Sequence, residues 1–137
     1  MRSLLDTNVL VYADASDEPV RQRRAVSLIT SLVGAGEAVL STQVLQEYVN
    51  VAVRKLRLPH ALIRERIAFY RRLDLVATSP DLIAGALDLH QTRCLSFYDA
   101  LIVQAAVAGG CQRVLSEDLQ HGAVLGGVRI ENPFAEH

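Results

Sequence analysis

Residues 99–118 read DALIVQAAVAGGCQRVLSED, an almost wholly apolar segment followed by two glycines and a second, shorter apolar run. The apolar residues from Asp99 to Ala108 are numerous enough for a helix, which Gly109 and Gly110 would end. Val114–Leu115 then indicates a short buried strand. A buried helix that leads into a buried strand is typical of a parallel sheet covered by helices.

The same alternation extends along the rest of the chain. Short apolar runs at 4–5, 38–40, 75–76 and 128–130 predict further strands. Helical spacing predicts helices that begin at Pro19 and Pro80, and others over about 43–56 and 60–73. The sequence shows no internal repeat, linker or low-complexity segment. We therefore expect a single α/β/α domain over residues 1–137, with a mainly parallel sheet of about five strands.

The bulk composition narrows the class of protein. A chain of 137 residues can bury a core without disulfides or a structural metal. No apolar run approaches the roughly 18 residues needed to cross a bilayer, and the start lacks a signal-peptide pattern. Cys94 and Cys111 have no metal-ligand spacing. The net charge of −1 argues against a plain electrostatic nucleic-acid coat, and we expect a cytoplasmic, reduced protein.

Four acidic residues occupy similar places in this order of elements. Asp6 ends the first strand, and Glu47 lies in the first turns of the helix after the second strand. Asp99 opens the apolar helix, and Asp118 comes just after the fourth strand. Because ligands of an open parallel sheet bind beyond the carboxyl ends of its strands, we expect the four carboxylates to converge there.

Converging carboxylates have a definite chemistry. Each close pair costs about 4 kcal/mol at the effective dielectric of a protein surface, so a cluster raises its pKa values or recruits a cation. Oxygen ligands without histidine or cysteine select hard ions such as Mg²⁺ or Mn²⁺. Such an ion can activate water and stabilise charge on a phosphate oxygen. The four acids therefore predict a Mg²⁺ or Mn²⁺ site.

Each acid also has a purely structural interpretation. Asp6 suits the N-cap of the helix that follows it, and Asp118 suits an ordinary turn. Periodicity places Glu47 with Gln43 on the polar side of their helix, where solvent exposure is the simpler interpretation. A serine three residues before Asp99 supplies capping-box-like spacing. Capping does not explain why a helix that is apolar all round carries a charge.

Four segments together resemble the motifs of PIN-domain nucleases. They are Leu4–Leu10, Gln46–Glu47, Ser96–Ile102 and Leu115–Leu119, and the tail from Gly122 to Phe134 is similar to that of the VapC-type toxins in this family. The resemblance spans nearly the whole chain. It implies a PIN-like fold and a metal-dependent endoribonuclease that uses Mg²⁺ or Mn²⁺, commonly the toxin of a type II toxin–antitoxin pair.

On this resemblance Asp6, Glu47, Asp99 and Asp118 form the catalytic and metal-binding site. Asp6 and Asp99 would be the direct ligands, while Glu47 would hold the ion through water or help to activate the attacking water. Asp118 would complete the site or support a second ion. Glu117 leaves the identity of the fourth acid open, and the family motif favours Asp118.

Other polar residues are candidates for supporting roles. Thr7, Asn8 and Ser116 could orient the acids through hydrogen bonds. The arginines of the first half could contact phosphates or pair with nearby acids on solvated helix faces; they are Arg21, Arg23, Arg24, Arg54, Arg57, Arg64, Arg66, Arg71 and Arg72. Tyrosines could stack on unpaired bases, although core packing is the simpler expectation; they are Tyr12, Tyr48, Tyr70 and Tyr98.

The resemblance also implies partners. We expect an RNA substrate, a cognate antitoxin protein that covers the acidic site, and a homodimer formed through apolar helices, with no membrane association.

Two other functions are considered. Receiver domains and aspartyl phosphatases place a lysine near their phosphate, but Lys55 lies on a mid-chain helix, and Asn8 stands where a second aspartate would be. A PIN-like scaffold that binds RNA or protein without cleaving would not need the four acids, and all four are present.

Overall fold

The short apolar runs form one six-stranded sheet in the computed structural model, which describes residues 1–135. Its strands lie in the order β3-β2-β1-β4-β6-β5. Their bounds are β1 Ser3–Leu5, β2 Ala38–Ser41, β3 Asp74–Val76, β4 Arg113–Leu115, β5 Val124–Leu125 and β6 Val128–Glu131. All neighbouring pairs are parallel except β5 with β6. Strands β1 and β2 are buried at every residue, as expected for inner strands covered on both faces.

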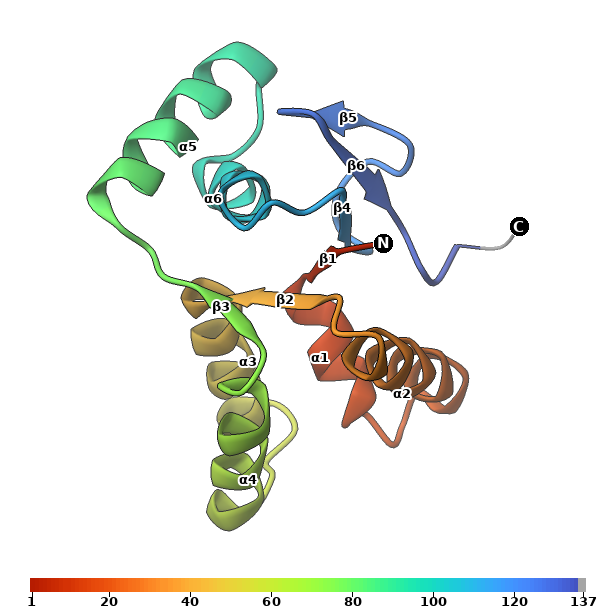
Figure 1. The fold of residues 1–137 in the computed structure, drawn as a ribbon. Coiled ribbons are helices and arrows are strands. Elements are labelled where there is room, and N and C mark those ends of the chain that lie inside the picture. Colours follow the sequence, from red (N-terminus) through yellow and green to blue (C-terminus); the bar gives the residue numbers. More distant parts are fainter. Residues whose placement is uncertain (136–137) are drawn as a thin grey trace.

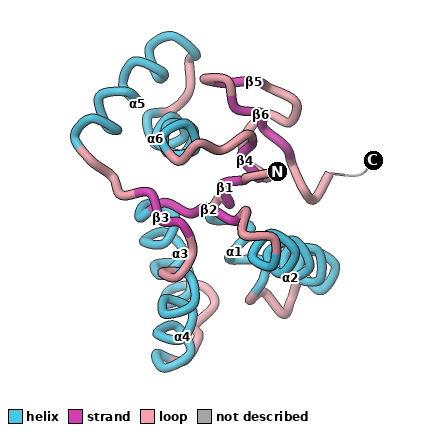
Figure 2. The backbone as a smooth tube through the Cα atoms, in the orientation of Figure 1, coloured by secondary structure: helices cyan, strands magenta, loops and turns pink. Residues whose placement is uncertain are grey.

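Six helices cover the two faces of this sheet (Figure 1). They are α1 Thr7–Ala13, α2 Pro19–Gly34, α3 Thr42–Arg54, α4 His60–Tyr70, α5 Pro80–Arg93 and α6 Phe97–Ala108. Helices α5 and α6 lie on one side of the strands and α1 to α4 on the other, with the sheet between them (Figure 2). Helix α6 is buried at six of its residues, which explains why its sequence is apolar all round. The predicted α/β/α architecture with a mainly parallel sheet is confirmed.

The turns from strand to helix place polar caps along the carboxyl edge of the sheet. Asp6 follows β1 and accepts a hydrogen bond from the first backbone N–H of α1. Ser41, the last residue of β2, caps α3 by accepting from Val44 N–H. These side chains satisfy helix N–H groups that have no partner within the helix. The same turns therefore place polar side chains where the parallel strands end.

Two details differ from the sequence prediction. The hairpin strand Val124–Leu125 was not predicted, so the sheet has six strands rather than about five. A strand of two residues carries no periodicity, and its turn depends on Gly126 and Gly127, whose φ angles are 59° and 82°. Helix α6 also begins at Phe97, so Asp99 lies in its first turn rather than at its first residue.

An ion pair between a nearly buried Asp14 and a partly exposed Arg66 ties three helices together on the α1–α4 side. Asp14, at the end of α1, accepts a hydrogen bond from the Tyr48 hydroxyl of α3 at 2.6 Å and lies 2.8 Å from an Arg66 guanidinium nitrogen of α4. Burial alone would raise the pKa of Asp14, but these hydrogen bonds from Arg66 and Tyr48 outweigh it and lower the pKa below 3.8. Among residues 1–135, no helix is both long and apolar enough to cross a membrane.

Candidate functional site

Asp6 is the most buried of the four predicted acids, with 7% of its surface exposed. It directly follows the central strand β1, and its backbone N–H donates to the Leu115 carbonyl of β4 at 3.0 Å. One carboxylate oxygen accepts from Thr7 N–H at 2.7 Å, and the other accepts from the Ser116 hydroxyl at 2.6 Å. The carboxylate is therefore fixed in orientation from both sides.

Burial raises the pKa of Asp6 from 3.8 to about 6. The hydrogen bonds from Ser116 and Thr7 lower this pKa, while the negative charges of Asp118 and Glu47 raise it further. The ionised carboxylate is thus disfavoured both by loss of hydration and by its acidic neighbours. A cation at this place would relieve both effects.

Asp118 is joined to Asp6 through Ser116. The Ser116 hydroxyl donates to Asp6 and accepts from Asp118 N–H at 3.1 Å. The Asp118 carboxylate, which is exposed, accepts from the Asn8 side-chain amide at 3.1 Å. A serine and an asparagine thus hold two acids of different burial beside the ends of β1 and β4.

Glu47 approaches the same place from α3. Its two carboxylate oxygens accept from the Thr7 hydroxyl at 2.9 Å and from the Gln43 amide at 2.8 Å. The Gln43 amide also contacts the backbone carbonyl of Tyr98 at 3.3 Å. Glu47 is exposed, as its polar helix side predicts, but Gln43 is buried because it spans from α3 to the start of α6.

Asp99 lies in the first turn of α6 and is half-buried. Its N–H donates to the Ser96 hydroxyl at 3.1 Å, so the predicted cap exists. Asp6, Glu47 and Asp118 belong to one hydrogen-bonded network, and Gln43 links this network to the Tyr98 carbonyl beside Asp99. Across residues 1–135, no three acidic, histidine or cysteine side chains lie close enough together to form a metal cluster on their own.

Glu117 makes contacts that point away from the other acids. One carboxylate oxygen accepts from the Tyr12 hydroxyl at 2.6 Å, and the other accepts from the Arg21 guanidinium at 2.9 Å. Burial alone would raise the pKa of Glu117, but the hydrogen bonds from Tyr12 and Arg21 outweigh it and lower the pKa. Because Glu117 is already paired with a cation, Arg21, while Asp118 is joined to Asp6 through Ser116, Asp118 is the better placed of the two neighbouring acids.

The structure adds Gln43 to the site, and it gives Tyr12 and Arg21 contacts other than the RNA contacts for which the sequence made them candidates. Gln43 stands four positions before Glu47, and this spacing was a usable signal for contact on one helix face. Tyr12 and Arg21 reach Glu117 across about a hundred residues, and no local pattern indicates them. Tyr98, expected in the core, is 67% exposed beside the acids, whereas Tyr48 and Tyr70 are buried as expected.

Comparison with known proteins supports the family and the fold. The model of the PIN domain family matches residues 3–124, and no curated protein sequence matches the chain. A toxin–antitoxin complex from Klebsiella pneumoniae has a similar structure, with a TM-score of 0.72 and 17% identity over 96% of this chain and 98% of that chain.

Two further solved structures have the same fold. VapBC2 from Rickettsia felis, bound to a promoter DNA fragment, has a TM-score of 0.68 and 19% identity over 96% of this chain and 98% of that chain. VapC20 from Mycobacterium tuberculosis, a toxin that cleaves the sarcin–ricin loop, has a TM-score of 0.66 and 17% identity over 85% of this chain and 89% of that chain. At these identities the likeness establishes the fold.

Proposed function

Since this chain belongs to the PIN domain family, we propose that it is a metal-dependent endoribonuclease and the toxin of a type II toxin–antitoxin pair. The observation that carries the proposal is the buried Asp6 carboxylate, whose pKa is raised to about 6 by burial and by two acidic neighbours. A cation beside this carboxylate would favour its ionised form and offset the charges of Asp118 and Glu47. In a protein of the PIN domain family, such a cation would serve the hydrolysis of a phosphate ester.

The residues present fit a hard divalent cation. All four side chains offer carboxylate oxygens, which suit Mg²⁺ or Mn²⁺. Mg²⁺ keeps several waters and needs only one or two protein carboxylates, so a preformed cluster is not required. Asp6 and Asp99 would hold the ion directly, with Glu47 and Asp118 beside them. When bound, the ion would activate water and stabilise charge on a phosphate oxygen.

Groups of the protein itself would orient the acids and accept a proton. The Thr7 backbone N–H and the Ser116 hydroxyl hold Asp6 in one orientation, and the Asn8 side-chain amide does the same for Asp118. Glu47 is exposed and would accept a proton from the attacking water at a carboxylate oxygen. These roles of Thr7, Asn8 and Ser116 agree with the hydrogen bonds predicted from the sequence.

Tyr98 is proposed to contact the RNA. Its side chain is 67% exposed, and its backbone carbonyl accepts from Gln43, the residue that also holds Glu47. An exposed aromatic ring beside the acids can stack on an unpaired base. We therefore expect a single-stranded or looped RNA segment at this edge of the sheet.

Two protein partners are proposed, an antitoxin and a second copy of this chain. The structures that this chain resembles include a toxin–antitoxin complex and a VapBC assembly, so we propose a cognate antitoxin that covers the acidic site. Helix α5 exposes Ile83 and Leu87, which are four residues apart and therefore share a helix face. We propose this face for a homodimer, and light scattering that gives a monomer at micromolar concentration would refute it.

Cleavage of a mixed cellular RNA pool tests the function. The native chain should cut with Mg²⁺ or Mn²⁺, while a chelator, Asp6→Asn or Asp99→Asn should abolish cutting. Asp88→Asn, an exposed acid on α5, should cut normally. Cutting that survives the chelator or both substitutions would refute the metal mechanism. A folded protein that binds Mn²⁺ but cuts neither this pool nor intact ribosomes would instead be the non-catalytic scaffold.

A further inference from the structure

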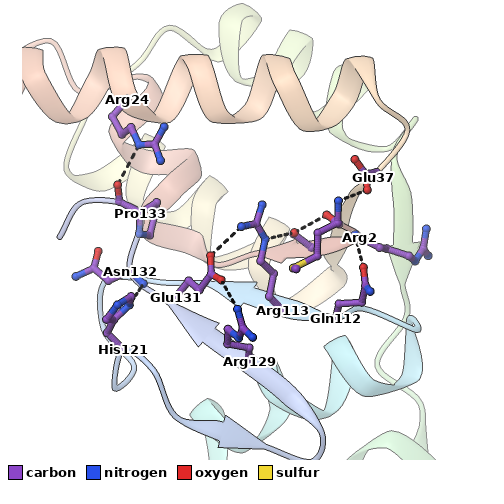
Figure 3. Close-up of polar contacts among 12 residues, drawn as sticks. Arg2, Arg24, Glu37, Gln112, Arg113, His121, Arg129, Glu131, Asn132 and Pro133 are labelled. Carbon is purple, nitrogen blue, oxygen red and sulfur yellow. Dashed lines mark hydrogen bonds and ion pairs between the residues drawn. The ribbon is translucent and has the colours of Figure 1, made fainter. Parts of the chain in front are cut away.

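A cavity of about 340 Å³ lies between α2 and the β4–β6 part of the sheet. Arg24 enters it from the helix, while Arg113 and Arg129 enter it from the strands (Figure 3). Glu131 lies between the two strand arginines, and His121 lies at one end. The volume is within the range of pockets that bind small molecules.

The lining of this cavity is positively charged although the chain is not. Three arginines face a single glutamate, so the excess is two positive charges in a protein of net charge −1. The Glu131 carboxylate is shared, since one oxygen lies 2.8 Å from Arg113 and the other 3.6 Å from Arg129. The backbone N–H of Asn132 donates to the Nδ1 atom of His121 at 2.9 Å.

Two of the arginines are held in place by hydrogen bonds that leave other guanidinium N–H donors available to a ligand. Arg24 donates from its Nε atom to the Pro133 carbonyl at 3.0 Å, and Arg113 donates from Nε to the Ser3 hydroxyl at 2.6 Å. A guanidinium has five N–H donors in a fixed plane, so both keep further donors for a ligand. Side chains anchored in this way lose little freedom when they bind an anion.

The cavity adjoins the acidic site through the backbone. Leu115 and Glu131 both line it, and their carbonyls accept from the N–H groups of Asp6 and Ser116 respectively. Planar guanidiniums arranged around one space match the geometry of a phosphate group better than that of a simple halide ion. The arginines could instead serve only to form ion pairs with Glu131. That alternative does not account for Arg24, which donates to a backbone carbonyl rather than to Glu131.

We propose that this cavity binds a phosphate group, carried either by an RNA strand or by a free nucleotide. The proposal does not depend on cleavage, because binding can be measured with a chelator present. The probes are AMP and a single-stranded RNA hexamer, titrated by calorimetry against the native chain. The test variant is Arg24→Gln with Arg129→Gln, and both residues are exposed enough to change without loss of the core.

The matched control is Arg23→Gln, which removes an exposed arginine from the same helix outside the cavity lining. The native chain should bind saturably, and the double variant should bind at least about tenfold more weakly, since two charged hydrogen-bond donors are lost. The control should stay close to the native affinity. Weakening of both probes, with AMP competing against RNA, would identify an RNA phosphate; weakening of AMP alone would identify a free nucleotide.

Three results would overturn the proposal. The native chain could bind neither probe saturably, or the double variant could bind as tightly as the native chain. The control could also weaken binding as much as the double variant, which would show a general effect of charge rather than a site. Circular dichroism of each variant establishes that the fold is retained.

Discussion

Replacing Asp6 with asparagine is expected to stabilise the metal-free protein at neutral pH while it removes activity. Asp6 is 7% exposed, and its carboxylate faces the charges of Asp118 and Glu47. Asparagine has the same shape and carries no charge. It can still accept from Thr7 N–H and keep a hydrogen bond with Ser116, so the substitution mainly removes the electrostatic cost of ionisation.

The magnitude follows from the pKa of Asp6, which burial raises from 3.8 to about 6. This rise corresponds to about 3 kcal/mol, since one pKa unit is about 1.4 kcal/mol. Asparagine makes weaker hydrogen bonds than a carboxylate, which offsets about 1 kcal/mol of this gain. We therefore expect Asp6→Asn to add about 1–2 kcal/mol to the free energy of unfolding, or roughly 3–8 °C in Tm.

The pH dependence of this effect has a definite sign. Because the folded state raises the pKa of Asp6, folded protein binds the proton more tightly than unfolded protein between pH 3.8 and about 6. The stability of the native chain associated with this group is fully present below pH 3.8 and is lost as the pH rises through about 6. The advantage of Asp6→Asn should therefore be full at pH 7.5 and small at about pH 4.

Urea and thermal unfolding in a chelator, at both pH values, measure this effect for the native chain, Asp6→Asn and the control Asp88→Asn. Adding Mg²⁺ should then stabilise the native chain more than Asp6→Asn, because a ligand stabilises only the state that binds it. An Asp6→Asn protein that is less stable than the native chain at pH 7.5 would refute the reasoning. A stability difference between these two proteins that is the same at pH 7.5 and at about pH 4 would also refute it.

Three further substitutions probe other parts of the fold. Arg66→Met should cost about 2 kcal/mol of stability in urea unfolding, because it leaves the Asp14 carboxylate nearly buried without its cation; a neutral result would show that water replaces the guanidinium. Tyr12→Phe removes the hydrogen bond to Glu117 and should cost about 1 kcal/mol. Because Glu117 is held away from the other acids, the Mg²⁺ concentration for half-maximal cleavage should stay unchanged, and a raised requirement would show that Tyr12 also supports the acidic site. Gly109→Ala adds a methyl group 2.9 Å from a side chain of β3 and should lower the free energy of unfolding by about 1–3 kcal/mol, measured by thermal unfolding against the native chain.

Much of the fold follows from local patterns in the sequence. The apolar runs become the inner strands, and the glycines after Ala108 end α6 where predicted. Strand positions and helix ends depend on backbone preference and on neighbours a few residues away, and both are encoded locally. Thr7, Asn8 and Ser116 were predictable as candidates because they adjoin acids along the chain, but their side chains contact acids from distant segments.

Other features arise only from the tertiary structure. Periodicity assigns Gln43 to a polar helix side, yet it is buried because the start of α6 packs over it. Helical periodicity also cannot distinguish Tyr98, which is exposed, from Tyr48, which is buried. Hydrophobic spacing shows that a helix has an apolar face, but not which distant segment covers the remaining faces.

In the acidic site, too, the sequence determined some features and the tertiary structure determined others. The sequence by itself determined which acids follow the strands, and hence which residues were candidates. The tertiary structure decided that Asp6 is buried, that Asp118 lies beside it and that Glu117 is held elsewhere by Tyr12. Burial and the distances between charges determine a carboxylate's pKa, and these depend on segments about a hundred residues apart that meet only in the folded chain.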